Sequence, residues 1–241
     1  GSTCRTPALF TITSLIPNST TITACNSYTW AVNGTTYTSS GTYSSVTGCN
    51  TETLNLTINA IDYANLQFPD SPTICQGGTF TAYGQVYEAG LTEAAGQAAG
   101  IDVEFGISPN GSNTNPSLWT NWIPAVFNVQ VGNNDEYQIT TGAALTSGTY
   151  YYTFRYKLSS CTTWQYGGFP NGFWNGTTQN SGVLTINPLT TNDNVTTSIC
   201  AGSSYIWPLP NGTGLTYTTA QTGLTNTVGC NTATLNLTIS P

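Results

Sequence analysis

Gly48-Cys49-Asn50-Thr51-Glu52-Thr53-Leu54-Asn55-Leu56-Thr57-Ile58 is the stretch that decides the fold. It recurs near the other end of the chain as Gly229-Cys230-Asn231-Thr232-Ala233-Thr234-Leu235-Asn236-Leu237-Thr238-Ile239, where Ala233 takes the place of Glu52. After each cysteine, apolar and polar residues alternate, which predicts a half-buried β-strand. Two near-copies predict a duplicated module.

The surrounding residues extend the repeat to two modules, residues 18–60 and 189–241. Both show the same order of a cysteine, a tyrosine, a tryptophan, an Asn-Gly-Thr triplet, a second tyrosine and a glycine before the repeated strand; in the first copy these are Cys25, Tyr28, Trp30, Asn33-Gly34-Thr35, Tyr37 and Gly41. Asn-Gly between strand-like runs predicts a hairpin. Modules this small need a crosslink. Repeat logic therefore predicts the disulfides Cys25–Cys49 and Cys200–Cys230.

Residues 61–188 differ from the repeats and predict an Ig-like β-sandwich, because short strand-like runs alternate with turns rich in Gly, Asn and Pro. The predicted strands are 79–87, 101–107, 125–131, 137–141, 149–158 and 182–186. Residues 91–99 are expected to form a loop. Cys75 and Cys161 are the two cysteines here and are expected to pair, although six cysteines allow 15 pairings. The fold class is thus all-β, with a sandwich between two disulfide-crosslinked repeat modules.

Residues 1–17 resemble the last strand of an incomplete repeat. Cys4, Thr6 and Leu9 match Cys49, Thr51 and Leu54 in spacing. The apolar residues of this candidate donor strand are Leu9, Phe10, Ile12, Leu15 and Ile16. The strand could close its own first repeat, or pair with a sheet edge of a neighbouring subunit and build a head-to-tail polymer. A domain cut from a longer tandem array would leave the same strand, and Cys4 is expected to be unpaired or intermolecular.

The composition excludes several function classes. Only 5% of the 241 residues are charged and three are basic, which argues against nucleic-acid binding and against an anionic membrane surface. The chain has no His, so a Ser–His or Cys–His catalytic system is excluded. The absence of a Cys-x-x-Cys pair argues against zinc, and no cofactor, metal or membrane insertion is expected. Disulfides and the lack of a signal peptide indicate a mature or trimmed extracellular or cell-surface chain.

Two sets of side chains were weighed as sites. Asp102 with Glu104, and Glu88 with Glu93, are candidate carboxylate pairs, but solvated acids or a weak calcium site are the simpler interpretation. Aromatic residues of the middle domain form a candidate glycan-binding face, the alternative being that they pack within the sandwich or over its ends. The candidate glycan-binding residues are Trp119, Trp122, Trp164, Tyr166, Phe173 and Trp174.

Several motifs resemble the tandem repeats of very large surface adhesins from Bacteroidetes such as flavobacteria. They are Cys-x-x-Tyr-x-Trp, Asn-Gly-Thr-x-Tyr-Thr, Gly-Thr-Tyr and Gly-Cys-x-Thr-x-Thr-Leu-Asn-Leu-Thr-Ile, matched closely by residues 25–58 and more loosely by residues 200–239. The middle domain, with residues 84–90 and 173–177, looks like β-sandwich modules in secreted proteins of the same bacteria. The resemblance implies export and a cell-surface role, and it carries over no catalytic residue.

These observations together predict a non-enzymatic structural or adhesive protein. The expected function is a subunit of a surface filament or a module of a large adhesin, whose partners are copies of itself joined head to tail by strand pairing, or neighbouring repeats of a longer chain. The alternative is a carbohydrate-binding, lectin-like module that uses the middle-domain aromatics.

Overall fold

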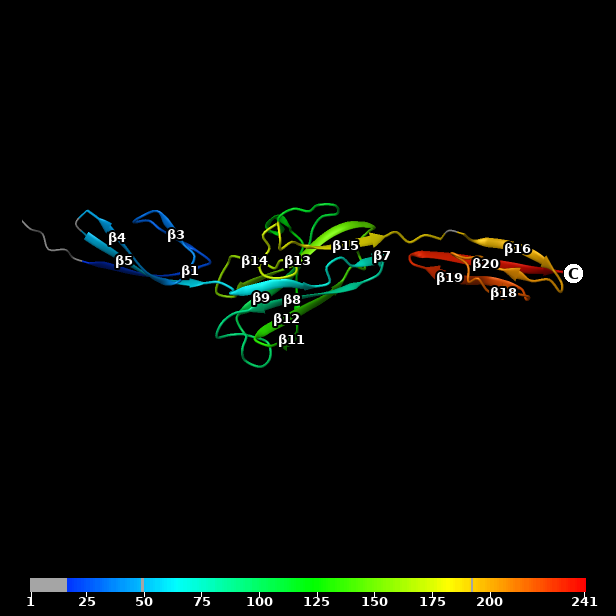
Figure 1. Ribbon diagram of the computed structural model, residues 1–241, viewed down its shortest axis with the longest axis horizontal. Coiled ribbons are helices and arrows are strands. Elements are labelled where there is room, and N and C mark those ends of the chain that lie inside the picture. Colours follow the sequence, from blue (N-terminus) through cyan, green and yellow to red (C-terminus); the bar gives the residue numbers. More distant parts are fainter. Residues whose placement is uncertain (1–16, 49, 192) are drawn as a thin grey trace, which may run out of the picture. The chain divides into compact units, whose positions relative to one another are not determined.

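The computed structural model describes residues 17–241 except residues 49 and 192, and its elements are labelled in Figure 1. The described residues form β-strands and one short 3-10 turn, η1 (Pro116–Leu118), without an α-helix. The chain separates into two compact units. One unit comprises the described residues up to Ala60 together with Lys157–Thr163, and the other comprises the described residues of Ile61–Tyr156 and Trp164–Pro241.

The first repeat module is a three-stranded sheet with a small hairpin. Its strands are β1 (Asn18–Cys25), β2 (Tyr28–Trp30), β3 (Thr35–Tyr37), β4 (Gly41–Thr47) and β5 (Asn50–Asn59). The sheet has the order β1-β5-β4, with β1 parallel and β4 antiparallel to β5. Strands β2 and β3 form the hairpin that Asn33-Gly34 predicts, and Gly34 adopts a φ of 70° in its turn. Trp30, Leu54 and Leu56 form the buried core.

The second repeat module has the same design. Its strands are β16 (Val195–Cys200), β17 (Tyr205–Ile206), β18 (Thr216–Tyr217), β19 (Gln221–Val228) and β20 (Asn231–Ser240). The sheet order is β16-β20-β19, again with a parallel first pair, and β17 pairs with β18. Trp207 lies in the core on Leu235 and Leu237, as Trp30 lies on Leu54 and Leu56 in the first module. Each module therefore encloses one tryptophan, as the repeat predicts.

The middle domain consists of two sheets. One has the order β11-β12-β8-β6 and is made of β6 (Tyr63–Phe68), β8 (Phe80–Tyr87), β11 (Val126–Val131) and β12 (Asn134–Thr141). The other has the order β10-β9-β13-β15-β7, with β14 on β13, and is made of β7 (Thr73–Cys75), β9 (Ile101–Ile107), β10 (Trp122–Pro124), β13 (Gly148–Leu158), β14 (Gln165–Tyr166) and β15 (Gly182–Asn187).

This strand order is that of an immunoglobulin domain. If β6, β8, β9, β10, β11, β12, β13 and β15 are read as strands A, B, C, C′, D, E, F and G, one sheet has the order D-E-B-A and the other C′-C-F-G. The hydroxyl group of Tyr150, near the start of β13, donates a hydrogen bond of 3.1 Å to the backbone carbonyl of Thr146. That contact is the tyrosine corner of such folds. The predicted all-β, Ig-like sandwich is therefore confirmed.

Aromatic side chains fill the space between the two sheets. Phe105, Tyr152 and Phe154 are fully buried, and Phe80 packs edge-on against Tyr152. The predicted strand 101–107 matches β9, and the other five predicted strands correspond to β8, β11, β12, β13 and β15 within three residues. Strands β6, β7, β10 and β14 were not predicted, because three of them have only two or three residues and β6 is buried on both faces.

Candidate functional site

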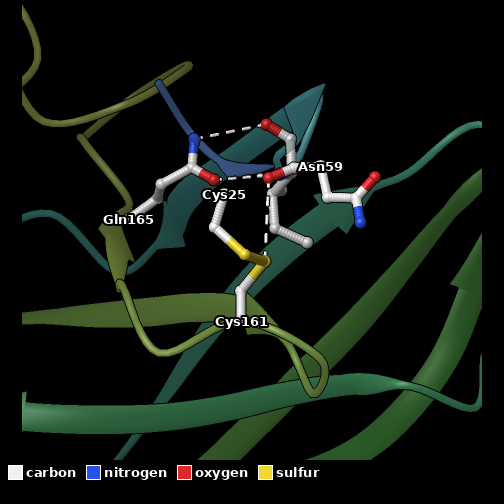
Figure 2. The surroundings of a disulfide bond; sticks show 5 residues. Cys25, Asn59, Cys161 and Gln165 are labelled. Atoms are coloured by element: carbon white, nitrogen blue, oxygen red, sulfur yellow. Dashed lines mark hydrogen bonds between the residues drawn. A yellow bond between two sulfur atoms is a disulfide. The ribbon is translucent and has the colours of Figure 1, made fainter. Parts of the chain in front are cut away.

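The first crosslink joins a repeat module to a loop of the chain that follows β13. Cys25, the last residue of β1, forms a disulfide with Cys161, and their Cα atoms are 5.8 Å apart (Figure 2). Cys161 lies in a turn where its N–H donates to the carbonyl of Leu158 at 2.8 Å. The carbonyl oxygen of Asn59 lies 3.7 Å from the Cys161 sulfur and accepts a hydrogen bond of 3.0 Å from the N–H of Asn26. The bond thus forms where β1 and β5 both end.

The chain that follows β5 is held by a glutamine. The N–H of Ile61 donates to Oε1 of Gln165 at 2.9 Å, and Nε2 of Gln165 donates to the carbonyl of Ile61 at 3.3 Å. Both hydrogen bonds use the backbone of one residue, so the amide of Gln165 acts as a strand partner would. Gln165 follows Cys161 by four positions, so this contact lies close in sequence to the disulfide.

The second crosslink joins the sandwich to the second repeat module. Cys75, the last residue of β7, forms a disulfide with Cys230, with the Cα atoms 5.4 Å apart. Cys230 lies in the turn between β19 and β20, and its carbonyl accepts a hydrogen bond of 3.0 Å from Thr190. The carbonyl of Thr190 accepts in turn from Thr232 at 2.9 Å. The connecting segment therefore runs beside the start of β20.

All three predicted cysteine pairings are wrong. Cys25 bonds to Cys161 instead of Cys49, Cys75 bonds to Cys230 instead of Cys161, and Cys200 is an exposed free cysteine. For the two pairings within the modules, the cause is the parallel pairing of the first and last strands of each module. It places Cys200 opposite Ser240, whereas Cys230 precedes the other end of β20, about 30 Å away for a strand of 10 residues. A disulfide requires Cα atoms within about 7 Å.

The two disulfides overlap in sequence and create three parallel covalent paths. With both bonds intact, the Cys25–Cys161 junction connects to the Cys75–Cys230 junction through residues 25–75, 75–161 and 161–230. The shortest path is about 50 residues, the difference between positions 25 and 75, and it spans at most about 170 Å when extended. Without the disulfides, Cys25 and Cys230 are separated by about 205 residues, the difference between their positions, or about 700 Å. The crosslinks therefore limit how far this chain can extend.

Four of the candidate glycan-binding aromatics gather around one arginine. The guanidinium of Arg155 lies 4.3 Å from the ring centroid of Trp122 and 4.2 Å from that of Trp164. Trp122 stacks on the buried ring of Trp119 and contacts Tyr166. The Nε–H of Arg155 donates to Glu104 at 2.8 Å, which completes a partly buried ion pair.

The indole N–H groups of this cluster are also used internally. Trp119 donates to the hydroxyl of Thr114 at 3.3 Å, and Trp122 donates to the carbonyl of Trp119 at 2.9 Å. Phe173 and Trp174 lie in the segment beside β14, where the N–H of Trp174 donates to the carbonyl of Tyr166 at 2.8 Å. The rings of Trp119, Trp122, Trp164 and Tyr166 pack on one another or on Arg155, which favours the packing interpretation for these four residues.

The two candidate carboxylate pairs have different surroundings: Glu104 faces a cation, whereas Glu88 lies close enough to Asp62 and Glu93 to interact with their charges. Glu104 is bound by Arg155, and no group of three or more His, Cys, Asp or Glu residues in the described part of the chain could hold a metal ion. Glu88 accepts a hydrogen bond of 3.1 Å from the N–H of Asp62, and the N–H of Ala89 donates to Asp62 at 3.0 Å. Burial, and then the negative charge of Asp62, raise the pKa of Glu88 from its ordinary value of 4.5 to about 7.

Some predicted residues lie outside the part of the chain that the structure describes. They are Cys4, Cys49 and the candidate donor-strand residues Leu9, Phe10, Ile12, Leu15 and Ile16. Sequence reasoning in turn missed the roles of Gln165 and of the Arg155 ion pair. The sequence offered one signal for the Arg155 ion pair: an arginine in a predicted strand, with tryptophans in the segments on both sides of that strand.

Comparison with known proteins yields structural likeness alone. No protein-family model and no curated protein matches the chain. Among solved structures, the I9–I11 tandem from titin is similar, with 13% identity, 83% of this chain and 74% of that chain covered, and a TM-score of 0.27. A mutated variant of titin domains I67–I69 has 10% identity, coverage of 90% and 83%, and a TM-score of 0.31. These scores support no statement on function.

The cellular location and the general kind of this protein are inferred from its own fold and disulfides. Across the described residues, no helix is long and apolar enough to cross a membrane. The disulfides and the all-β, Ig-like fold are consistent with an extracellular or secreted protein and compatible with a structural module.

Proposed function

We propose that this chain is a non-enzymatic, tension-bearing module of an extracellular surface filament or large adhesin. The observation that carries the proposal is the pair of overlapping disulfides, Cys25–Cys161 and Cys75–Cys230. Each joins a repeat module to chain outside that module, so load passes between modules through covalent bonds. A disulfide inside a module would crosslink that module alone and would carry no load from one module to the next.

The strand pairing of the repeat modules supports the same function. In each module the entering strand is parallel to the leaving strand, β1 to β5 and β16 to β20. Tension applied at the start of β1 and the end of β5 therefore acts along the pair and loads all eight residue pairs in shear. A hairpin pulled at its open end would lose its hydrogen bonds one at a time. The parallel pair resists load even where the disulfide is reduced.

Single-molecule pulling from the two chain ends tests this function. A background with Cys4→Ser, Cys49→Ser and Cys200→Ser leaves only the two crosslinks described above. We expect the contour between Cys25 and Cys230 to be limited to about 170 Å when oxidised and to reach about 700 Å after reduction. Equal contour lengths in the two states would contradict a load-bearing role for the disulfides.

The head-to-tail arrangement is the more specific part of the proposal. Residues 7–16 are apolar on both faces in sequence, as a strand that enters a sheet of another subunit would be. We expect the purified protein to form fibres visible by electron microscopy, and a chain lacking residues 1–17 to remain monomeric. Fibres that persist without these residues would rule out strand donation. A Cys4→Ser chain is the matched control for an intermolecular disulfide, read by non-reducing electrophoresis.

A further inference from the structure

The two repeat modules carry a cysteine at the same structural position. Cys25 pairs with Asn59 at the end of the parallel β1–β5 ladder, and Cys200 pairs with Ser240 at the end of the parallel β16–β20 ladder. The next backbone N–H crosses to the last strand in both modules, from Asn26 to Asn59 at 3.0 Å and from Ala201 to Ser240 at 2.8 Å. The local geometry around the two sulfur atoms is therefore repeated.

The surroundings of these cysteines differ in one respect. In the first module, Cys25, Asn26 and Asn59 are all partly buried, and Cys25 is bonded to Cys161. In the second module, the corresponding Cys200, Ala201 and Ser240 are all exposed, and Cys200 is the free cysteine among those that the structure describes. The second module thus has a cysteine at the position that forms a disulfide in the first module, but this cysteine is exposed and unbonded.

We propose that Cys200 is a covalent docking site for a β-sandwich domain that directly follows Pro241 and presents a cysteine in the position of Cys161. The bonded first module shows what such a partner must supply. Ile61 follows the last residue of β5, Asn59, by two positions and is bound through its backbone by Gln165, and Cys161 supplies the sulfur that bonds to Cys25. The inference extends the proposed function and rests on it only in taking the partner to be a sandwich of the same kind.

A second, identical chain does not offer a reduced cysteine at position 161. Its Cys161 is already bonded to its own Cys25, and its Cys75 and Cys230 are bonded to each other. A domain placed after Pro241 offers a reduced cysteine within a short tether, which raises the effective concentration of the thiol.

The bond forms by thiol–disulfide exchange with a small-molecule disulfide as oxidant. The Cys200 thiolate attacks oxidised glutathione, forms a mixed disulfide and releases one glutathione thiolate. The partner thiolate then attacks the Cys200 sulfur, the protein disulfide forms, and the second glutathione leaves as a thiolate. Two protein thiols are oxidised, one glutathione disulfide is reduced to two thiols, and the two protons go to solvent or to the released thiolates.

An extended chain tests the proposal. A second copy of residues 61–241 is added directly after Pro241. Its first residue then follows Pro241 as Ile61 follows Ala60 in the first module. Cys4 and Cys49 are changed to Ser. After refolding with reduced and oxidised glutathione, non-reducing peptide mapping should find Cys200 of the first part bonded to Cys161 of the appended copy. With Cys200→Ser in the first part, that Cys161 should remain a free thiol.

The Cys75–Cys230 bond of the appended copy reports whether that copy has folded. If this bond forms and Cys200 of the first part stays free, the proposal is wrong. If this bond does not form, a second chain tests the proposal. In that chain, residues 193–241 with Cys230→Ser replace residues 18–60, so that the second module stands before the sandwich. Cys200 should then bond to Cys161. A free Cys200 in that chain also overturns the proposal. Mixed 241-residue chains should give no Cys200–Cys161 bond between molecules. A Cys200–Cys161 bond between molecules would overturn the preference for a following domain.

The outcome is distinct from that of the pulling experiment. The extensibility of the chain depends on Cys25–Cys161 and Cys75–Cys230, whereas docking depends on Cys200. A negative result in either experiment therefore does not contradict the proposal that the other experiment tests.

Discussion

Cys75 and Cys230 are 155 positions apart in the chain, yet their disulfide holds the two Cα atoms 5.4 Å apart. Removing a native disulfide from a small secreted domain typically costs about 2–5 kcal/mol. We expect the double substitution Cys75→Ser, Cys230→Ser to lower the free energy of unfolding by that amount, measured by chemical denaturation. Cys200→Ser is the matched control and should change stability by less than about 0.5 kcal/mol. Equal effects of the two changes would refute the assignment of the bond.

Gly84 leaves room for the aromatic side chains of Phe154 and Tyr156 at the centre of the sandwich. A methyl group on Gly84 would lie 2.7 Å from the ring of Phe154 and 2.9 Å from the carbonyl oxygen of Asn65. These neighbours are a buried side chain and backbone, so Gly84→Ala should cost about 1–3 kcal/mol. Gly41→Ala, which meets only the Tyr43 ring at 3.4 Å, should be tolerated. Thermal unfolding of both variants makes the comparison, and a tolerated Gly84→Ala would show that the sheets are packed more loosely.

The planar guanidinium of Arg155 packs between Trp122 and Trp164 and pairs with Glu104. Lysine keeps the charge but loses the stacking and the paired N–H groups, so Arg155→Lys should cost about 1–2 kcal/mol. A double-mutant cycle with Glu104→Gln separates the ion pair from the stacking. If Trp122→Ala left stability unchanged and abolished binding on a glycan array, the carbohydrate-binding alternative would replace the packing interpretation.

The raised pKa of Glu88 predicts a dependence of stability on pH. Its pKa is about 7 in the folded chain and near 4.5 when unperturbed, so the folded state binds the proton more tightly. Stability is therefore unaffected by this group below about pH 4.5, falls as the pH rises from there to 7, and stays reduced above. Glu88→Gln should remove this fall, whereas Glu52→Gln, in the first repeat module, should retain it. Thermal midpoints measured between pH 4 and 8 test the prediction, and an unchanged slope in Glu88→Gln would exclude Glu88 as the cause.

Local patterns predicted much of the fold because they act over a few residues. Alternation after Gly48 and Gly229 predicted β5 and β20, and Asn33-Gly34 predicted the β2–β3 hairpin. The short strands β7 and β10 escaped prediction, because two or three residues carry no period and these strands exist only through pairing with β15 and β9. The aromatic candidates were placed in the right domain, but their packing around Arg155 depends on which strands are neighbours.

The sequence by itself determined that this protein is all-β, that two modules share one design, and that each encloses a tryptophan. Those features follow from side-chain periodicity and turn chemistry, which are local. Only the tertiary structure decided which cysteines bond. Cys200 and Cys230 belong to one module, but the parallel pairing of β16 with β20 places them at opposite ends of a strand of 10 residues. Disulfide partners are chosen by distance in space, and that distance depends on strand register between segments far apart in the chain.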